Sequence, residues 1–576
     1  MLQWHMRNME KETEMKKIVV VDAVSTGANF IADIMKRGYE PVALIPYAES
    51  GSYFSTFDKH ALEAARKKYP CDPLTIHASK KYEETLAVIR GLDPVLVIAG
   101  SEGGVELATQ LAADLDLVGN PVENMDAYTK KTAMHAALAK AGVRNIRGRI
   151  VHTYEEACAF MEEINTENVV LKPIHSAGSL RVRLCSSAEE VRKGFEELLG
   201  SEDFYGEKID TLLIQERIFG TEYIVNTMSR HGRHKVLSMR KYDKVKTDQG
   251  SYIYNYCESV NELGAGHSEL IEYTFSVLDA IGITDGPVHG EYMIDKKGPV
   301  LIEINCRPMG GGMPSEFLDM SAGHHETDAI LDAYLDEENF ISHLDDPYRM
   351  KRKGILKDII TPKDIDVTAS PIKVIIDHLQ SLYCADLQSG SEIFHLSRTE
   401  DLETASGEVY LIHDDPEVVK RECDLLHLLE TKYFRILYHG IGAKETPKDE
   451  HALSVAEAVR IADPVGCSLI VSDLPIDTDG MLCVSPDELN KAPGMYDQVF
   501  FALSSYGEGH EVEATVQAIF DAMEKVKNGG RFIVPETFYQ LVPYGRAFIE
   551  ALLTIAGFGI EAPTYNKRRI VSGKRK

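Results

Sequence analysis

One short segment in the middle of the chain holds the polar residues whose spacing is most informative. Apolar runs on both sides of Asp295-Lys-Lys-Gly298 predict a hairpin of two β-strands joined by a tight turn. On the second strand Glu303, Asn305 and Arg307 are two residues apart. Because the side chains of a strand alternate between its faces, we expect these three on one face, with Leu301 before them.

The chemistry of this face suits a divalent cation beside a phosphate. Glu291, on the first strand, can share the face with Glu303 and Asn305 across the hairpin. Two carboxylates and an amide oxygen are hard oxygen ligands of the kind that Mg²⁺ prefers, and clustered acids would repel one another without a cation. Arg307 could then hold a phosphoryl oxygen, and Gly310–Gly312 would let the backbone approach a ligand. The alternative, a solvated charged face, explains this combination less well.

A lysine at the end of another predicted strand is a second candidate for phosphate binding. The strand Asn168–Lys172 is followed by a loop of small residues, Ile174–Ser179. The backbone N–H groups of such a loop can approach a polyphosphate closely, while the ammonium group neutralises its charge. The signal is weak alone, because lysines between a strand and a turn are common. No Walker A sequence occurs in the chain.

Regular elements must position these residues, and the first of them form an open α/β unit near the N-terminus. Lys17–Val21, Pro41–Pro46 and Val95–Ala99 read as strands that alternate with helices, which predicts a parallel sheet. Ligands bind such sheets at the carboxyl ends of the strands. The loops Ser25–Gly27 and Gly100–Gly104 are therefore candidate walls of a substrate site, or simply turns. No complete G-x-G-x-x-G follows the first strand, so a dinucleotide site has little support.

The composition excludes several classes of function. The chain has 576 residues and a formal net charge of −28, and a surface this acidic repels phosphate backbones and anionic lipids. We therefore expect no nucleic-acid partner and no membrane binding. No apolar run approaches the roughly 20 residues of a bilayer span, and the N-terminal segment lacks the apolar core of a signal peptide. The nine cysteines are scattered and form no C-x-x-C pair, so we expect reduced thiols and a cytoplasmic location.

Five short motifs, in order along the chain, resemble one enzyme family. They are Tyr128-Thr-Lys-Lys131-Thr-Ala-Met134, Val169-Val-Leu-Lys172-Pro173, Gln215-Glu216-x-x-x-Gly220-x-Glu222, His289-x-Glu291 and Leu301-Ile-Glu303-Ile-Asn305-x-Arg307. Each motif is weak alone, but the stretch from about residue 16 to 435 resembles the ATP-grasp carboxylate–amine ligases. Within that family it looks most like the L-amino-acid ligases, which join two amino acids into a dipeptide.

The resemblance implies a role for each of these residues. Lys131 and Lys172 would bind the phosphates of ATP. Further nucleotide contacts would come from the loop after Lys172, from an adenine hinge and from a residue near the ribose: Ser176, Gly178, Ser179, Gln215, Glu216, Ile218 and Glu222. Two Mg²⁺ ions, with Mn²⁺ as an alternative, would be held by Glu291, Glu303 and Asn305. The catalytic groups would be Arg307, Glu303 and Lys172. The substrate would contact His289, Arg307, Gly310 and Gly311, although His289 could equally only support Glu291.

The implied reaction is the ATP-dependent formation of an amide. Transfer of the γ-phosphoryl group to a carboxylate gives an acyl phosphate, which an amine attacks to release phosphate, with ADP as the other product. The loop Ile174–Ser179 would close as a lid, since an acyl phosphate hydrolyses in water. We expect small-molecule carboxylate and amine substrates, amino acids above all, and the segment Arg240–Asn255 is a candidate pocket for them or a solvated loop. Three alternatives stay open: another ATP-grasp activity such as a carboxylase, a non-catalytic nucleotide sensor, and a bifunctional protein that also binds S-adenosylmethionine.

The expected fold class is α/β, with an ATP-grasp architecture and an additional α/β domain after it. The architecture comprises a Rossmann-like N-terminal domain, central ATP-grasp α+β domains and a β-rich C-terminal subdomain. The expected boundaries are 1–15 for a disordered leader, 16–125 for the N-terminal domain, 126–345 for the ATP-grasp domain with its ATP lid at about 130–205, 346–437 for the β-rich subdomain, 438–451 for a linker and 452–576 for the additional domain.

The last part of the chain predicts a second α/β unit. Its predicted elements are strands at Cys467–Ser472, Asp497–Ala502 and Arg531–Val534, a helix at Val512–Val526 and a turn at Asn528–Gly530. The run from Tyr496 to Glu536 resembles the later half of class I methyltransferases, which implies a Rossmann-like domain. The glycine-rich motif that holds the methionine part of S-adenosylmethionine in that family is missing here, so we expect a truncated or degenerate domain. Its expected role is structural, dimerising or product-channelling, and a homodimer stays an open option.

Overall fold

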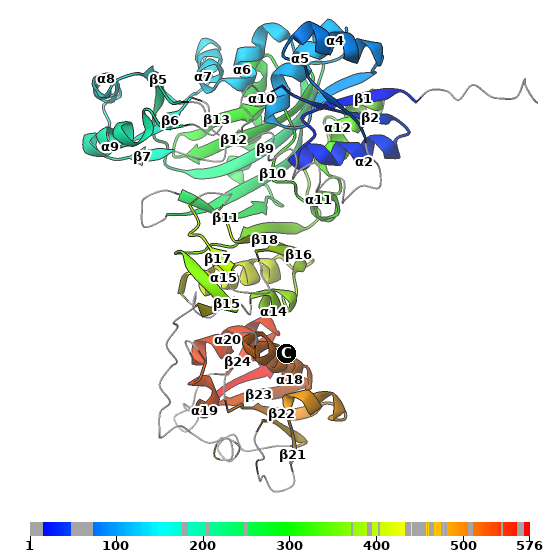
Figure 1. Ribbon diagram of the computed structural model, residues 1–576, viewed down its shortest axis with the longest axis vertical. Coiled ribbons are helices and arrows are strands. Elements are labelled where there is room, and N and C mark those ends of the chain that lie inside the picture. Colours follow the sequence, from blue (N-terminus) through cyan, green and yellow to red (C-terminus); the bar gives the residue numbers. More distant parts are fainter. Residues whose placement is uncertain are drawn as a thin grey trace, which may run out of the picture. The chain divides into compact units, whose positions relative to one another are not determined.

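The structure is a computed structural model, and its ribbon divides into two compact units (Figure 1), residues 1–252 with 257–353, and residues 253–256 with 354–576. The described residues are 15–47, 73–174, 182–202, 208–246, 252–369, 372–388, 394–400, 404–432, 439–440, 457, 459, 466–473, 476, 481–504, 511–542, 545–561 and 570–576. Most of the expected leader and most of the expected linker lie outside the described residues.

A parallel sheet of four strands opens the first unit, as the sequence predicts. Its order is β3 (Leu74–His77), β2 (Glu40–Ile45), β1 (Lys17–Val21), β4 (Leu96–Ala99). Helices α4 (Tyr82–Gly91) and α5 (Val105–Asp114) bury one face, while α2 (Asn29–Lys36) and α12 (Glu326–Leu335) bury the other. Covered on both faces, β1 is a continuous apolar run rather than an alternating one.

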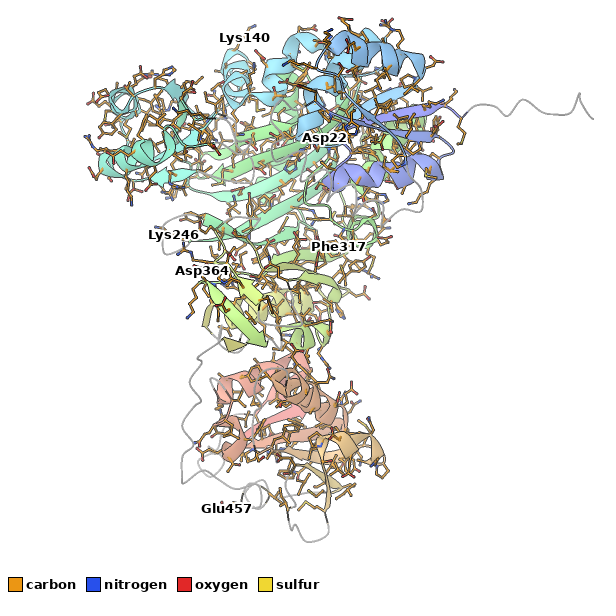
Figure 2. The ribbon with its side chains drawn as sticks, viewed as in Figure 1. Asp22, Lys140, Lys246, Phe317, Asp364 and Glu457 are labelled. Atoms are coloured by element: carbon orange, nitrogen blue, oxygen red, sulfur yellow. The ribbon has the colours of Figure 1, made fainter. Side chains whose placement is uncertain are left out.

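The turns after β1 and β4 lie against each other at the carboxyl edge of this sheet. A Cβ on Gly27 would lie under 3 Å from the backbone of Gly100, so the close approach requires glycine. The Ser101 hydroxyl donates a hydrogen bond to the carboxylate of Asp22, which is labelled in Figure 2. These glycines therefore do more than form turns, because they let two loops share one edge.

A separate antiparallel sheet carries the predicted phosphate lysine. Its order is β5 (Gly148–Val151), β8 (Leu212–Glu216), β6 (Val169–Pro173), β7 (Arg183–Cys185). Helices α8 (Tyr154–Ile164) and α9 (Ala188–Leu198) pack on it, and a hydroxyl caps the start of each, from Thr153 and Ser187. The strand that ends at Lys172-Pro173 is confirmed.

The predicted hairpin belongs to a larger sheet in the centre of Figure 1. Its strands include, in order, β13 (Gly298–Asn305), β12 (Gly286–Asp295), β9 (Thr221–Arg230), β10 (Arg233–Lys246) and β11 (Tyr252–Ser259). Helix α10 (Ala265–Ile281) buries one face of this sheet against residues such as Val225, Met239 and Ile304. The opposite face carries polar side chains and is the face that matters for chemistry.

Two consecutive helices cover residues 125–140. α6 (Met125–Thr129) and α7 (Lys131–Lys140) are separated by Lys130, whose backbone is extended with φ −108° and ψ 114°. The helical conformation is therefore interrupted at one residue, and Lys131 becomes the first residue of a new helix.

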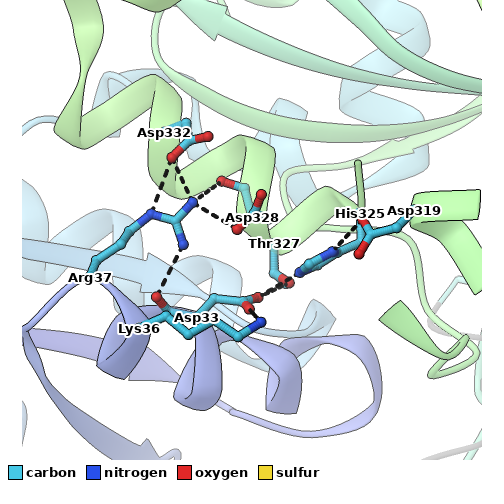
Figure 3. A network of polar contacts seen from close by, with 8 residues as sticks. All are labelled: Asp33, Lys36, Arg37, Asp319, His325, Thr327, Asp328 and Asp332. Atoms are coloured by element: carbon cyan, nitrogen blue, oxygen red, sulfur yellow. Dashed lines mark hydrogen bonds and ion pairs between the residues drawn. The ribbon is translucent and has the colours of Figure 1, made fainter. Parts of the chain in front are cut away.

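A polar network fastens α2 to α12 and to the segment before it (Figure 3). Arg37, just after α2, pairs with two aspartates of α12 at 2.6 and 2.8 Å. The ring of His325 lies between two carboxylates, with Nε2 at 3.1 Å from Asp33 and Nδ1 at 2.8 Å from Asp319. Thr327 also donates a hydrogen bond to Asp33 at 2.7 Å.

The second unit begins with a β-rich region, as the sequence predicts. It contains β14 (Lys353–Asp358), β15 (Ile365–Ala369), α14 (Ile372–Asp377), β16 (Leu382–Leu387), β17 (Phe394–Leu396), β18 (Gly407–His413), α15 (Pro416–Lys432) and β19 (His439–Gly440). Strand β17 ends at Leu396, before Thr399. Thr399 instead exchanges hydrogen bonds with Thr361, at 2.9 Å for both.

The additional α/β region forms a six-stranded sheet with the order β21 (Leu482–Val484), β20 (Ser468–Val471), β22 (Tyr496–Phe501), β23 (Val526–Pro535), β25 (Ile570–Arg575), β24 (Phe558–Ile560). The first four strands are parallel and β25 is antiparallel to both neighbours. Helices α18 (Glu511–Glu524) and α20 (Arg546–Ile555) pack into the core. The turn predicted at Asn528–Gly530 lies inside β23, which absorbs it as an irregularity of register.

The β-rich region and the additional α/β region share one hydrophobic core, which runs from Ile355 to Val571. The ring of His378 stacks on Phe520 of α18, with centroids 3.8 Å apart, and Gln380 donates a hydrogen bond to the carbonyl of Ile555 at 3.4 Å. Within the described residues no helix is both long and apolar enough to cross a membrane, and the described cysteines are free thiols.

Candidate active site

The register of the central sheet places the predicted metal ligands opposite one another. On β12 and β13, Glu291 lies opposite Glu303 and His289 lies opposite Asn305. The next strand, β9, continues the second row with Asn226 opposite His289. Residues that are opposite on neighbouring strands project to the same face. The two carboxylates and the amide expected to form a cation site are therefore neighbours on one polar face.

The face expected for Leu301 is wrong. The register shifts between Glu291 and Tyr292, which pair with Glu303 and Leu301, so Ile302 is an extra, unpaired residue. Such a β-bulge interrupts the strict alternation of a strand. Leu301 therefore joins the core beside α10 and is fully buried, while Glu303 keeps its place on the polar face.

Two lysines from different elements approach this face. The Nζ atom of Lys131 lies 2.5 Å from Oε2 of Glu303. Burial disfavours the charge of Lys131, but the Glu303 and Glu102 carboxylates outweigh it and raise the pKa of this lysine. Lys172 is buried at the end of β6, and burial together with the charge of Lys131 lowers its pKa to about 8. Two neighbouring cations, one held by a carboxylate, form a local positive site in an acidic protein.

The other carboxylates of this face also have positive or hydrogen-bonding partners. Glu222 pairs with Lys244 at 2.8 Å, and burial raises the pKa of Glu222 although Lys244 opposes the shift. Nε2 of His289 lies 3.4 Å from Oε1 of Glu291. Burial works against ionisation of Glu291, but the His289 hydrogen bond and charge lower its pKa to about 2. Glu291 is therefore an anion at neutral pH, as a cation ligand must be.

The donor set fits a magnesium site by its chemistry. Glu291, Glu303 and Asn305 offer oxygen ligands from adjacent strands. Elsewhere in the described part of the chain, one group of His and Asp residues has ligand atoms within 4.8 Å of one another, Asp33 with His325 and Asp328. That group belongs to the network between α2 and α12 in Figure 3 and lies outside the candidate active site.

Loops of the N-terminal sheet border the same site. Nη2 of Arg307 lies 3.5 Å from the Glu102 carboxylate, in the loop after β4. The Gly312 N–H donates a hydrogen bond to the Thr26 hydroxyl at 3.1 Å, in the turn after β1. Gly311 and Gly312 have φ values of 86° and 58°, which side-chain-bearing residues rarely adopt. Both loops predicted as substrate walls therefore meet the end of β13 and the glycine run after it.

The residues assigned to the adenine hinge lie between two sheets. Gln215 and Glu216 end β8, Ile218 lies in the connection, and Glu222 is near the start of β9. The Glu216 side chain pairs with Arg147 at 2.8 Å, and its backbone N–H donates a hydrogen bond to the Arg147 carbonyl at 2.9 Å. Three residues assigned to phosphate binding lie outside the described residues: Ser176, Gly178 and Ser179.

Most of the predicted site residues that the structure describes lie on or beside one polar face. Those gathered on or beside the polar face are Lys131, Lys172, Glu222, His289, Glu291, Glu303, Asn305 and Arg307. Gly310 and Gly311 follow Arg307 in the glycine run. Gln215, Glu216 and Ile218 approach from the sheet that carries Lys172. Their roles in binding and catalysis stay predictions.

Three contributors escape sequence reasoning. Asn226 binds Nδ1 of His289 at 2.8 Å through Oδ1, and its amide group donates to Glu326. Glu326 also accepts a hydrogen bond from the backbone N–H of Met309 at 2.8 Å. Lys244 is the partner of Glu222 described above. The alternation of polar residues along β10 could have indicated Lys244, but no local pattern connects Glu326 with a strand 100 residues earlier.

Comparison with protein families gives a match on the same elements. Residues 165–316 match the family model described as "ATP-grasp domain". This part of the chain is similar to ATP-grasp domains. The matched range includes Lys172, the two strands of the hairpin and Arg307. The predicted fold class is confirmed by this match together with the solved structures below.

Relatives of known name are ligases and synthases. Dapdiamide A synthase of Enterobacter agglomerans is 28% identical over 431 residues, which covers 73% of this chain and 97% of that protein. The L-arginine-specific L-amino acid ligase of Bacillus subtilis is 26% identical over 226 residues, 38% of this chain and 52% of that protein. Among solved structures, an L-amino acid ligase from Bacillus licheniformis shares the fold, with a TM-score of 0.54, 16% identity and coverage of 72% of this chain and 98% of that chain. The expected enzyme class, an ATP-dependent ligase that forms amide bonds, is confirmed by these relatives.

Proposed function

We propose that this chain joins the carboxylate of one amino acid to the amine of another, at the polar face of the central sheet. The observation that carries the proposal is the placement of Glu291 opposite Glu303, with Lys131 paired to Glu303 and Lys172 buried nearby. The names of dapdiamide A synthase and of the L-arginine-specific L-amino acid ligase support amino acids as the substrate class.

ATP is the energy source in this proposal. Lys131 and Lys172 would neutralise its phosphates, and Gln215–Ile218 would contact its base, with Glu222 near the ribose. Glu291, Glu303 and Asn305 would hold two Mg²⁺ ions, for which Mn²⁺ is an alternative. Bound there, such ions would offset the negative charge that builds up on a phosphoryl group in transfer. The local cations also explain how a chain of net charge −28 can accept an anionic nucleotide.

The protein groups then have to serve two chemical steps. A carboxylate is a poor electrophile because its charge repels nucleophiles, so phosphorylation must precede attack by the amine. Arg307 would stabilise the transferring phosphoryl group, for which it must exchange its contact with Glu102. The backbone of Gly310 and Gly311 would approach the substrate. Exclusion of water protects the acyl phosphate until the amine attacks.

The test is a survey of pairs of amino acids and small acids with Mg-ATP, in which phosphate release is read together with product mass. Glu303→Gln should abolish product formation, because it removes one ligand charge and the partner of Lys131. Glu163→Gln is the matched control, since Glu163 forms an exposed pair with Arg149 away from the site. Unchanged ADP release by Glu303→Gln across the panel contradicts the proposal, and release that depends on bicarbonate would indicate a carboxylase instead.

For residues 452–576 we propose a truncated Rossmann-like domain related to class I methyltransferases, with a structural, dimerising or channelling role. The parallel strands β21, β20, β22 and β23 with packed helices support a Rossmann-like architecture. After β20 the chain reads Ser472-Asp-Leu-Pro475, without the glycines that hold S-adenosylmethionine in that family. Calorimetry of the full chain with S-adenosylmethionine tests this, because binding would favour the bifunctional alternative. A homodimer and a cytoplasmic location stay predictions.

A further inference from the structure

Arg240 is a buried cation whose two terminal nitrogens, Nη1 and Nη2, have no hydrogen-bond partner among the described residues. Its side chain is 1% exposed. A buried charge is costly unless it is paired and hydrogen-bonded. Three other cations of the site, Lys131, Lys244 and Arg307, have carboxylate partners. The unmet demand at Arg240 therefore points to an anion that is supplied from outside the chain.

The register shows which face Arg240 occupies. It lies opposite Ile224 of β9, which lies opposite Glu291 of β12, which lies opposite Glu303 of β13. Residues in such a row project to one face of the sheet. The preceding residue, Met239, lies opposite Val225 and packs in the core beside α10. Arg240 therefore shares the polar face with the two carboxylates of the candidate active site.

Arg240 lies at the opposite end of this row from Lys131, one of the two lysines predicted to bind phosphate. Lys131 approaches the row at its Glu303 end. Arg240 lies three strands away, which corresponds to about 14 Å between backbones at the usual spacing of strands. From Glu291 it is two strands away, or about 10 Å. A ligand that has its reacting group near Glu291 and a negative group a few bonds further along would bring that group to Arg240.

Neighbouring acids do not meet this demand. Both oxygens of Glu326, which lies beside the row of Asn226 and Ser238, already accept hydrogen bonds. The donors are Asn226, Ser238 at 3.2 Å and the backbone N–H of Met309 at 2.8 Å. Glu258, on the neighbouring strand β11, pairs with Lys241 at 3.5 Å and not with Arg240. The terminal N–H groups of Arg240 therefore stay available, and their planar arrangement suits two parallel hydrogen bonds to one carboxylate.

We propose that Arg240 binds a substrate carboxylate that the reaction does not consume, namely the free carboxylate of the amino acid that supplies the amine. The inference rests on the proposed ligase function and deepens it, because it assigns the residue that recognises the second amino acid. A second carboxylate on the activated acid has the same chemistry, so the experiment must separate the two sources.

The experiment compares Arg240→Gln with the wild type, using the amino-acid pair that the wild type joins. For the amine substrate, each amino acid is assayed beside its carboxamide, which lacks the carboxylate. The KM for the amino acid should rise about 30-fold or more in Arg240→Gln, the loss expected when one partner of a buried charge pair is removed. The KM values for the carboxamide and for Mg-ATP should not change. Arg240→Lys should recover part of the loss.

Arg233→Gln is the matched control, because Arg233 begins the same strand, is exposed and pairs only loosely with Asp345 at 3.5 Å. Dicarboxylic acids and their monoamides form the second arm, and an effect confined to them would assign the activated acid and overturn our choice of substrate. Equal losses for the amino acid and the carboxamide, or a rise in KM for Mg-ATP alone, would overturn the carboxylate site altogether.

A binding measurement keeps this inference separate from the proposed function. Free amino acids should raise the melting temperature of the wild type, their carboxamides should not, and Arg240→Gln should lose the difference while it stays folded. If the wild type joins no pair but amino acids still protect it through Arg240, the ligase proposal fails and the carboxylate site stands. If no amino acid protects the wild type, the site is overturned.

Discussion

Glu326 organises the candidate active site through Met309 and Asn226, neither of which is a predicted metal ligand. Its carboxylate connects the backbone of Met309, just before the glycine run, with Asn226 on β9. Oδ1 of Asn226 in turn accepts a hydrogen bond from Nδ1–H of His289, whose other ring nitrogen faces Glu291. Glu326 therefore positions the site indirectly: it holds Asn226, and Asn226 fixes the orientation of the His289 ring.

Replacement of Glu326 by glutamine should therefore change turnover more than nucleotide binding. The amide NH₂ of glutamine would face the Met309 N–H, a donor against a donor, and leave that group without an acceptor. We expect kcat to fall about tenfold or more while KM for Mg-ATP changes little, since removal of a supporting partner commonly costs 10- to 100-fold. Steady-state kinetics with a parallel melting curve measure this. Glu338→Gln, on the exposed side of the next helix, should change neither quantity.

At the scale of elements, the network in Figure 3 couples α2 to the segment before α12. Burial disfavours the charge of His325, but hydrogen bonds to Asp33 and Asp319 outweigh it and raise its pKa to about 9. The folded state therefore binds the proton of His325 more tightly than the unfolded state. The stabilisation is fully present below about pH 6.5 and is lost as the pH rises through 9.

This predicts a pH-dependent stability that one substitution removes. Between pH 7 and 10 the wild type should lose roughly 1 to 2 kcal/mol of unfolding free energy that His325→Gln does not lose, a discounted figure for a partly screened group. Urea unfolding at several pH values measures the difference. His395→Gln is the control, because His395 forms a comparable but exposed pair with Asp366. Parallel curves for the wild type and His325→Gln would contradict the prediction.

The elements also show what the sequence can and cannot predict. Period-two spacing places Glu303 and Asn305 on a strand of the correct hairpin, since alternation is a local property. The strand expected to reach Arg307 is shorter, because β13 ends at Asn305 and Arg307 lies just beyond it. The same reasoning fails for Leu301, because nothing in the local pattern marks the bulge at Ile302. Apolar runs bounded by turns predict most strands correctly. Arg240 could be placed in a candidate pocket, but the lack of a hydrogen-bond partner for its terminal nitrogens among the described residues is a fact of tertiary structure.

At the scale of the whole molecule, the second unit is built around a core that both of its regions share. Phe520 of α18 is 1% exposed and stacks on His378, which follows α14. The sequence predicts a domain boundary near residue 450. In the structure, residues before and after this boundary belong to the same hydrophobic core. Shared burial of this kind makes two regions unfold together.

Phe520→Ala should consequently destabilise both regions of the second unit. Deletion of a buried ring costs about 3 to 5 kcal/mol, and we expect faster hydrogen exchange in peptides from both 404–432 and 511–542. Gln517→Ala is the control in the same helix, where the side chain donates a hydrogen bond to Asp521 at 2.7 Å. If only the peptides around α18 respond, the two regions are independent folding units.

The bulge at Ile302 also determines where this enzyme can change in length. On a regular strand, loss of one residue turns every later side chain to the other face. Ile302 is the exception on β13, because it has no partner on β12 and its removal would leave Leu301 in the core and Glu303 on the polar face. In an alignment of related chains, loss of one residue at or next to the bulge would keep Glu303 on the polar face, whereas loss of one residue after Glu303 would turn Asn305 to the other face.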